Sequence, residues 1–114
     1  MMVYAAWPSG AAGRKVYTFD PTSSKSVELS GTSVCDDQPA FSPDGKTIAY
    51  RYANDVWTMN ADGSAKKRLV QLSGGAGSPS WSPDGTKLTF GGDDTGQSRF
   101  DIWTVKPTVA ERVN

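Results

Sequence analysis

A stretch of this sequence occurs twice, and its recurrence decides the fold. Residues 38–50 read QPAFSPDGKTIAY and residues 78–90 read SPSWSPDGTKLTF, so the two copies lie 40 residues apart. A shorter element recurs three times, as VYTF at 16–19, VWTM at 56–59 and IWTV at 102–105. Self-similarity at a fixed spacing of about 40 residues is typical of proteins built from one repeated supersecondary unit.

Each repeat divides into short strands, because apolar and polar residues alternate and β-branched and aromatic residues are frequent. We name them a to d, from the inside of a propeller blade outward. The predicted strands are a at 39–42 and 79–82, b at 2–7, 47–52 and 87–91, c at 15–20, 55–60 and 101–106, and d at 26–30 and 67–72. Ser-Pro-Asp-Gly, at 42–45 and 82–85, closes a tight a–b hairpin, since proline presets φ and glycine accepts a positive φ.

No segment shows sustained helical spacing, so the sequence predicts an all-β fold: a partial β-propeller of four-stranded antiparallel blades. We expect a single unit over 1–114, with blade 1 at about 2–30, blade 2 at about 38–72 and blade 3 at about 78–114. Blade 1 has no predicted strand a. In blade 3, Lys66 maps to Arg112 by the 46-residue offset of the third copy, so strand d would barely begin.

Composition narrows the function classes. The 114 residues suit one small domain, and 12 basic residues balance 12 acidic ones. Lys66, Lys67 and Arg68 form a small basic cluster that we interpret as a solvated strand edge, so no nucleic-acid partner is expected. No run approaches the roughly 20 apolar residues of a membrane helix, so we expect no membrane insertion. The start at 1–8 has no basic region or apolar core, and no signal peptide is expected in this chain.

Residue types that most often carry catalysis are missing. The chain has no histidine, and Cys35 is its only cysteine. Ser-His and Cys-His nucleophile pairs, histidine-bound zinc and an internal disulfide therefore cannot form within it. We expect no enzyme, no cofactor and no catalytic, cofactor-binding or metal-binding residue, because only carboxylates, lysine or tyrosine remain for chemistry.

The repeats resemble the WD-like repeats of the TolB periplasmic protein and of the propeller domains of prolyl-oligopeptidase-type enzymes. The likeness rests on FSPDG at 41–45 and WSPDG at 81–85, each followed by a hydrophobic strand and then by DVW at 55–57 or DIW at 101–103. It runs from about residue 2 to 107. It is specific for the repeat and not for a function, because such blades serve many partners. A TolB-like use implies the periplasm; otherwise the cytoplasm is expected.

Propellers of this kind close with about six or seven blades, whereas this chain supplies about two and a half. Repeat units bury their apolar faces only against neighbours. Two copies would give about six sheets, so we expect the chain to pair with itself as a homodimer that completes a roughly six-bladed ring. A part of a larger propeller and a different oligomer remain open.

Topology points to one face as the binding surface. In an antiparallel blade, the d–a and b–c connections emerge on one side and the regular a–b and c–d turns on the other. We call the first side the loop face; binding residues favour variable loops on a rigid scaffold. Its irregular segments are predicted at 8–14, 32–37, 53–54, 73–78 and 91–100. The candidate loop-face binding residues are Arg14, Asp36, Asp37, Arg51, Asn54, Asp93, Asp94 and Arg99, with Gln97 beside them.

Several of these residues have two interpretations. Asp93 and Asp94 with Asp101 would offer oxygen ligands for Ca²⁺, but a full binding-loop signature is absent and a solvated acidic loop is favoured. Ion pairs from Asp36 and Asp37 to Arg51 or Arg99 across blades would add little stability if exposed.

The recurring motif residues favour structural roles. Asp44 and Asp84 are explained by turn chemistry. Aromatic residues at equivalent repeat positions favour blade-to-blade packing over ligand stacking; they are Tyr17, Trp57, Trp103, Phe41 and Trp81.

Two functions of different class follow from the sequence. The first is a non-enzymatic binding or scaffold module that presents its loop face and central channel to a protein, a peptide or a glycan. The second is a part of an enzyme, such as the gating propeller of a prolyl-oligopeptidase-like hydrolase, or a carboxylate-based hydrolase or lyase, whose paired acids would need a defined separation.

Overall fold

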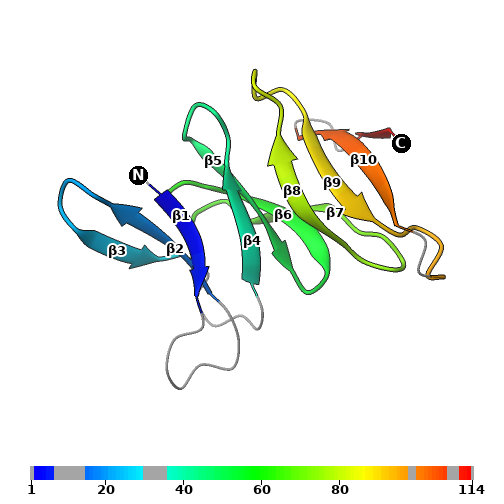
Figure 1. The fold of residues 1–114 in the computed structure, drawn as a ribbon, viewed down its shortest axis with the longest axis horizontal. Helices are drawn as coiled ribbons and strands as arrows, with labels where there is room; N and C mark the ends of the chain where they lie inside the picture. The colour runs from blue at the N-terminus through cyan, green and yellow to red at the C-terminus, as the bar shows by residue number, and fades with distance from the viewer. Residues whose placement is uncertain (1, 7–14, 30–35, 98–99, 108–110, 114) are drawn as a thin grey trace.

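The computed structural model of the chain describes residues 2–6, 15–29, 36–97, 100–107 and 111–113. They form antiparallel sheets that lie side by side along the long axis of the molecule (Figure 1). The first sheet contains β1 (Met2–Ala6), β2 (Lys15–Asp20) and β3 (Lys25–Glu28). The second contains β4 (Asp36–Phe41), β5 (Thr47–Tyr52), β6 (Asp55–Asn60) and β7 (Lys67–Val70). The third contains β8 (Ala76–Trp81), β9 (Leu88–Gly92), β10 (Asp101–Lys106) and β11 (Glu111–Val113).

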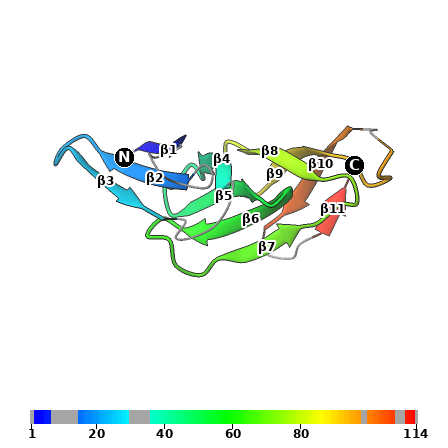
Figure 2. The same cartoon turned by 90° about the horizontal axis from the view of Figure 1, so that it is seen from below.

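The strand order within each sheet is that of a blade, with neighbouring strands consecutive in the chain. Seen from below, β4 and β8 lie toward one side of the molecule and β7 and β11 toward the other (Figure 2). The described residues contain no helix, so nothing in this part of the chain is long and apolar enough to cross a membrane as a helix. The all-β expectation is confirmed; the division into one unit of 1–114 stays a prediction.

The middle strands follow the sequence pattern closely. The three predicted c strands are β2, β6 and β10, with the expected bounds. The last strand is a correction: β11 forms and pairs with β10, with Val105 opposite Arg112, so the third sheet has four strands. The connection from β10 to β11 is shorter than that from β6 to β7, and strand d therefore begins earlier than the repeat offset predicted.

The predicted start of strand a is also corrected. β4 and β8 each begin three residues before the expected proline, at Asp36 and Ala76. The pairing register shifts between Asp37 and Ala40, and in the same way between Gly77 and Ser80. A proline cannot donate to the ladder, so the strand bulges there and pairing resumes on both sides. The sequence pattern showed only the part of the strand after the bulge.

The two Ser-Pro-Asp-Gly turns have the same hydrogen bonds and stand at the upper edge in Figure 1. In the first, Asp44 Oδ1 accepts from Ser42 Oγ over 2.6 Å and from the Lys46 amide over 3.0 Å, while Gly45 has a φ of 72°. In the second, Asp84 Oδ1 accepts from Ser82 Oγ over 2.7 Å and from the Thr86 amide over 3.1 Å. The structural interpretation of Asp44 and Asp84 is confirmed.

Each sheet has two different faces. We call the face with the cross-strand aromatic pair the large face; in the second sheet this pair is Tyr50 opposite Trp57. The other side carries Ala49, Val56 and Val70, and we call it the small face. Because side chains alternate along a strand, the large and small faces point in opposite directions.

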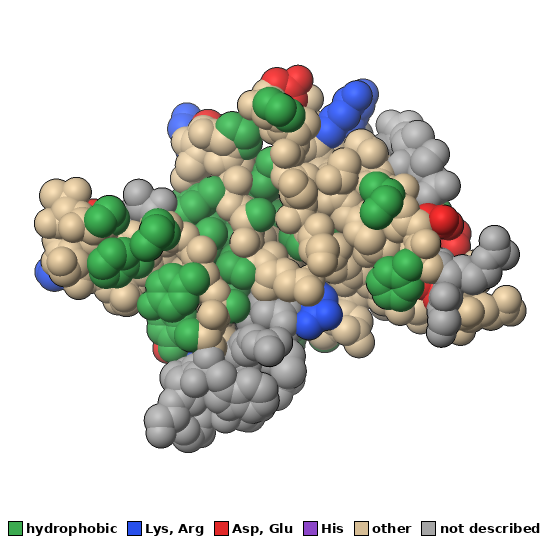
Figure 3. Space-filling view, in the orientation of Figure 1, with side chains coloured by type: hydrophobic (Ala, Val, Ile, Leu, Met, Phe, Trp, Pro, Cys, Tyr) green, Lys and Arg blue, Asp and Glu red, His purple; other side chains and the backbone are tan. Residues whose placement is uncertain are grey.

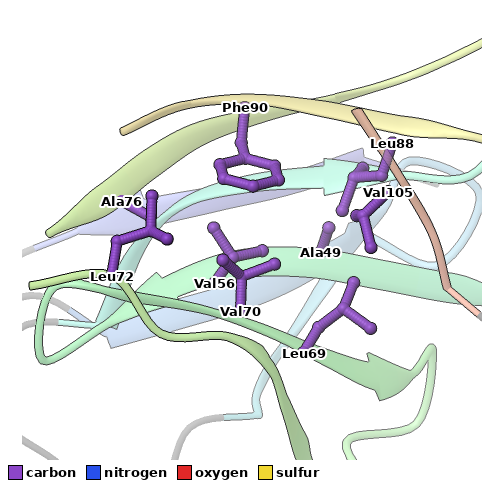
Figure 4. Packing of buried hydrophobic residues seen from close by; sticks show 9 residues of the cluster. All are labelled: Ala49, Val56, Leu69, Val70, Leu72, Ala76, Leu88, Phe90 and Val105. Carbon is purple, nitrogen blue, oxygen red and sulfur yellow. The ribbon is translucent and has the colours of Figure 1, made fainter. Parts of the chain in front are cut away.

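The core lies where a large face meets the small face of the preceding sheet. Ile48, Tyr50 and Met59 of the second sheet pack with Val16 and its neighbours from the first. Phe90, Leu88 and Val105 of the third sheet pack with the small face of the second, and Figure 4 shows the Phe90 ring directed toward Val56 and Val70. Phe90 is only 1% exposed, so the aromatic residue of the repeat fills the space between sheets.

The recurring tryptophans and Phe41 also pack between sheets. Phe41 and Trp57 contact the core shared by the first and second sheets. Trp81 and Trp103 contact the core shared by the second and third. The predicted packing role is confirmed for these four residues. Tyr17 is different, because it stacks on Tyr4 within the first sheet, with ring centroids 5.4 Å apart.

Candidate functional site

A pocket of about 210 Å³ opens on the loop face, between the second and third sheets. It is built where β4, β5, β8 and β9 approach the connections β5–β6, β7–β8 and β9–β10. In Figure 1 the first two of these connections lie at the lower edge, opposite the Ser-Pro-Asp-Gly turns. We call it the loop-face pocket, lined by Gln38, Arg51, Asn54, Gly74, Gly75, Ala76, Gly77, Ser78, Gly91 and Phe100. The expected gathering of b–c and d–a connections is therefore present.

The two bulges meet at this pocket. Gln38 and Ser78 hold equivalent repeat positions and have positive φ values of 54° and 52°. The Ser78 amide donates to Gln38 Oε1 over 2.6 Å, which joins the inner strands of two sheets. A positive φ is uncommon outside glycine and asparagine and often accompanies a functional constraint. The bulges thus hold two polar side chains at the pocket instead of continuing the ladder.

A tight turn places Asn54. Tyr52 pairs with Asp55, and the two residues between them, Ala53 and Asn54, have φ values of 52° and 67°. Two successive positive φ values define the type I′ hairpin, which matches the right-handed twist of the strands. The Asn54 carbonyl accepts from the Ala76 amide over 2.8 Å. The turn of the second sheet is therefore fixed to the start of β8.

Gly77 on β8 leaves room for the side chains of Gln38 and Arg51 in the pocket. A Cβ on Gly77 would lie 2.7 Å from Gln38 Oε1 and 3.0 Å from Arg51 Cδ. Real Cβ atoms essentially never approach as closely as the first of these distances. The absence of a Cβ on Gly77 therefore lets Gln38 and Arg51 lie against β8 as they do.

Asp93 is buried beside the β7–β8 connection, whose glycines line the pocket. Its side chain is 1% exposed, and its Oδ1 accepts from the Thr95 amide over 2.9 Å and from Thr95 Oγ1 over 2.6 Å. Its backbone also exchanges hydrogen bonds with Gly74 and Gly75 across the β7–β8 connection. Asp93 is therefore buried, not part of a solvated acidic loop as expected, while its binding role stays a prediction.

The other candidates separate into three groups. Arg51 and Asn54 line the pocket, whereas Asp94 is exposed on the β9–β10 connection and does not line it. Asp36 and Asp37 lie on β4 and not in a loop, and Asp37 is the cross-strand partner of Arg51. That pair therefore lies within one blade, not across two as predicted. Arg14 and Arg99 lie outside the described residues. A binding role for any of these residues stays a prediction.

The alternative Ca²⁺ site of Asp93, Asp94 and Asp101 is not assembled in the described part of the chain. There, no three acidic or cysteine side chains come close enough together to hold a metal ion. Asp101 begins β10 and pairs with Gly92, while the Asp93 carboxylate is turned to Thr95.

Among the pocket residues that sequence reasoning did not single out are Gln38, Ser78 and Phe100. Gln38 and Ser78 each precede the repeated proline, and that shared position was the available signal. Phe100 is 67% exposed at the rim, and its ring lies 3.9 Å from the position that a Cβ on Gly91 would take. Periodicity places Phe100 in a loop but gives no reason to direct its ring toward β9.

A larger hollow of about 790 Å³ lies on the side of the regular turns. Its walls include Trp81 and three exposed lysines, Lys67, Lys87 and Lys106. Asp44 and Asp84 also line it, but their Oδ1 atoms are committed to the turns. The serine hydroxyls and backbone amides that donate to these exposed carboxylates lower their pKa values, that of Asp84 to about 2. These acids act as turn residues and not as proton donors near neutral pH.

Comparison with known proteins places these sheets in context. No protein-family model matches the chain. A TolB homologue from Chlorobium luteolum is 30% identical over 92 residues, which cover 78% of this chain and 20% of that protein. Dipeptidyl-peptidase 5 from Porphyromonas gingivalis is 30% identical over 71 residues, 54% of this chain and 10% of the enzyme. The chain therefore spans a fifth or less of the length of these relatives.

Solved structures agree on the fold. A putative TolB from Agrobacterium tumefaciens superposes with a TM-score of 0.84 and 21% identity, over 97% of this chain and 43% of that one. TolB from Acinetobacter baumannii gives 0.79 and 15%, over 96% and 28%. The β-propeller domain of a trilobed protease from Pyrococcus furiosus gives 0.71 and 19%, over 98% and 37%. The expected partial propeller is confirmed as a fold, and its completion by a second copy stays a prediction.

Proposed function

Because this chain is a homologue of TolB-like β-propellers and covers part of such a propeller, we propose that it is a non-enzymatic binding module. In this proposal, the loop face and the channel beside the inner strands receive a protein partner through an extended peptide segment. The observation that carries it is the hydrogen bond from the Ser78 amide to Gln38 Oε1, which holds the Gln38 side chain in the pocket that Arg51 also lines. Fixed side chains lower the entropy cost of binding.

The size of the pocket favours one side chain of a peptide. Sites for whole small molecules usually measure about 300–1,000 Å³, whereas the loop-face pocket measures about 210 Å³. A single acidic side chain or a terminal carboxylate fits such a volume better than a sugar ring with its neighbours. A glycan, the other ligand class expected from the sequence, is therefore the less favoured occupant.

The chemistry of the lining favours a carboxylate within a peptide. The Arg51 guanidinium has five N–H donors in a planar fork that matches a carboxylate. The side chains of Gln38 and Asn54 carry amide groups that can pair with peptide N–H and C=O groups. Phe100 at the rim adds an exposed aromatic ring for the residue that follows.

Peptide binding tests this function. We would titrate the purified chain, by NMR or calorimetry, with short acetylated and amidated peptides that differ only by glutamate or glutamine at the central position. The glutamate peptide should bind more tightly, and Arg51→Gln should weaken it about tenfold or more, as loss of a charged hydrogen bond predicts. Lys87→Gln, on the side of the regular turns, is the matched control and should change nothing. Equal binding of both peptides, or an unaffected Arg51→Gln variant, would refute the carboxylate site.

The likeness to Dipeptidyl-peptidase 5 favours a second candidate, in which the chain is part of a propeller that accompanies a peptidase. The chain has no histidine for a serine-type triad, so any such activity would reside elsewhere in the protein. Hydrolysis of chromogenic peptide amides by the purified chain would contradict the non-enzymatic assignment. In a TolB-like use we expect the periplasm, and cell fractionation tests that location.

A further inference from the structure

The large hollow on the side of the regular turns lies between the second and third sheets, and we call it the turn-side hollow. It is lined by β6 and β7 of the second sheet, by β8 and β10 of the third, and by the two Ser-Pro-Asp-Gly turns. Basic side chains project at the upper edge of the molecule in Figure 3, where these turns lie. Its volume of about 790 Å³ falls within the range of about 300–1,000 Å³ that is usual for small-molecule sites.

The positive charge of the turn-side hollow comes from three lysines, Lys67, Lys87 and Lys106. All three are exposed, and their ammonium groups form no ion pair or hydrogen bond with any described residue. Like charges around a hollow raise the local concentration of ions of the opposite sign. The three ammonium groups are therefore available to an anion from solution.

The repeat does not require these lysines. By the offsets of 40 residues for β7 and β9 and 46 residues for β10, the equivalent positions one repeat earlier are uncharged, namely Val27, Thr47 and Asn60. The strand register agrees, because Lys67 lies opposite Thr58 and Val27 lies opposite the threonine of the preceding repeat. The same sheet thus folds without lysine at these positions. Their occurrence around one hollow favours a binding role.

Thr58 adds a polar group to the inner wall of the hollow. It is 4% exposed, and its hydroxyl has no hydrogen-bond partner among the described residues. A buried hydroxyl without a partner costs free energy, so a ligand atom that bonds to it is favoured. Trp81 has its indole N–H committed to a backbone carbonyl, and it offers the hollow the apolar surface of its ring.

Two carboxylates in the lining reduce the positive charge without cancelling it. Asp44 and Asp84 each accept hydrogen bonds at Oδ1 from a serine hydroxyl and a backbone amide of their own turn. Three lysines against two aspartates leave an excess of one positive charge in the lining. Removal of one carboxylate should therefore increase the attraction for an anion.

From this lining we propose that the turn-side hollow binds a small organic polyanion, a molecule with two or more anionic groups on a flat apolar ring. The lysines bind the anionic groups as flexible point charges. Thr58 donates a hydrogen bond from its hydroxyl, and Trp81 contacts the ring. The site lies on the side of the chain opposite the loop-face pocket, so it is a second binding function beside the proposed peptide site.

Fluorescence titration of the purified chain with a pyrene trisulfonate, a trianion on a flat ring, tests the proposal. Lys67→Gln and Lys106→Gln should each weaken binding about threefold, and the double variant about tenfold. Lys25→Gln is the matched control, because it removes the same charge from an exposed lysine of β3 that does not line the hollow. Raising the salt from about 0.01 M to about 0.15 M, which shortens the Debye length from about 30 Å to about 8 Å, should also weaken binding.

Two further variants distinguish a built site from a general attraction of charges. Asp84→Asn keeps an oxygen acceptor in the turn but removes a negative charge, so binding should tighten about threefold. Thr58→Val keeps the shape and charge of the hollow but removes the hydroxyl, so binding should weaken about threefold or more. Circular dichroism and urea unfolding check that each variant folds as the wild-type chain does.

The results that would overturn the proposal are equally definite. No binding by the wild-type chain, or equal weakening by Lys25→Gln and Lys67→Gln, would refute the site. Tripolyphosphate carries the charge without the ring and should bind more weakly than the trisulfonate. Equal affinities for the two anions would refute the proposed ligand class.

These outcomes do not depend on the peptide ligand. Lys87→Gln should weaken binding of the trisulfonate and leave the glutamate peptide unaffected, whereas the glutamate peptide reports on Arg51 at the other side of the chain. Either proposal can fail while the other stands.

Discussion

Trp81 donates a hydrogen bond from its indole Nε1 to the carbonyl oxygen of Ala40, over 3.0 Å, and so joins the inner strands of the second and third sheets. The two residues lie 41 positions apart, so Trp81 contacts the residue before its own repeat equivalent, Phe41. The Ser78 amide also donates to Gln38 Oε1, so two hydrogen bonds join β4 and β8 beside the apolar core between the sheets. We call these two bonds the polar seam.

Trp81→Phe tests that seam. The ring still packs, but the Ala40 carbonyl loses its donor, so we expect the free energy of unfolding to fall by about 1 kcal/mol or more. Urea unfolding followed by circular dichroism measures the change.

Trp57→Phe is the matched control for this variant. Among the described residues, Trp57 Nε1 is buried with no hydrogen-bond partner. Removing an unpaired buried N–H relieves a desolvation cost, which offsets part of the lost packing. An equal or greater loss of stability in Trp57→Phe than in Trp81→Phe would contradict the importance of the Trp81 bond.

The Ser-Pro-Asp-Gly turns predict a loss of stability in acid. The pKa of Asp84 falls from 3.8 to about 2 because Ser82 and Thr86 donate to its carboxylate, and the pKa of Asp44 is lowered in the same way. A depressed folded-state pKa stabilises the fold above the ordinary value, and that contribution disappears as pH falls through the folded-state value. We therefore expect the melting temperature to decrease between about pH 4 and pH 2.

Asp84→Asn should flatten this acid dependence, because the amide oxygen still accepts but no longer titrates. Asp94→Asn, at an exposed acid outside these turns, is the comparison. If both variants keep the wild-type slope of melting temperature against pH, the turn carboxylates are not the groups responsible.

Gly77→Ala should distort the loop-face pocket. The new methyl group would displace the ends of the Gln38 and Arg51 side chains, and loss of the hydrogen bond from the Ser78 amide to Gln38 Oε1 would cost about 1 kcal/mol. Gly91→Ala is the control from the same pocket, since its Cβ would lie 3.9 Å from Phe100, an ordinary contact. The melting temperature of Gly77→Ala should be lower than that of Gly91→Ala. Similar melting temperatures would show that the Gln38 and Arg51 side chains move aside without loss of stability.

Ala53→Gly should stabilise the chain. Ala53 has a φ of 52°, where a Cβ is strained, and glycine removes that strain at some cost in the entropy of unfolding. We expect a gain of up to about 1 kcal/mol. Ala40→Gly, on the strand, should instead lose about 0.5–1 kcal/mol. Chemical denaturation of both variants measures the change in the free energy of unfolding. A lower value for Ala53→Gly than for the wild-type chain would mean that the turn is not strained.

The sequence predicted those strands and turns that are determined by residues close together along the chain. The c strands have their expected bounds because Val16, Val56 and Ile102 each precede an aromatic residue in a clear alternation, and the turns follow from Pro43 and Gly45 and their repeats. The bulges at Gln38 and Ser78 arise from pairing with β5 and β9, and no local pattern records that pairing.

The site was only partly accessible from sequence for the same reason. Topology placed Arg51 and Asn54 on the correct face, but it could not show that the missing side chain of Gly77 admits Arg51. Nor could it show that Asp93, which looks like a surface acid in the sequence, is buried by Gly74 and Gly75 from the preceding connection.

The unequal faces of the sheets bear on how such a protein can lengthen over evolutionary time. A duplicated segment of about 40 residues would carry both a face with Tyr50 and Trp57 and a face with Val56. The inserted unit would fit between its parents at once, without selection for a new surface. The number of units can therefore change by a single genetic event, while the direction of stacking is inherited with every copy.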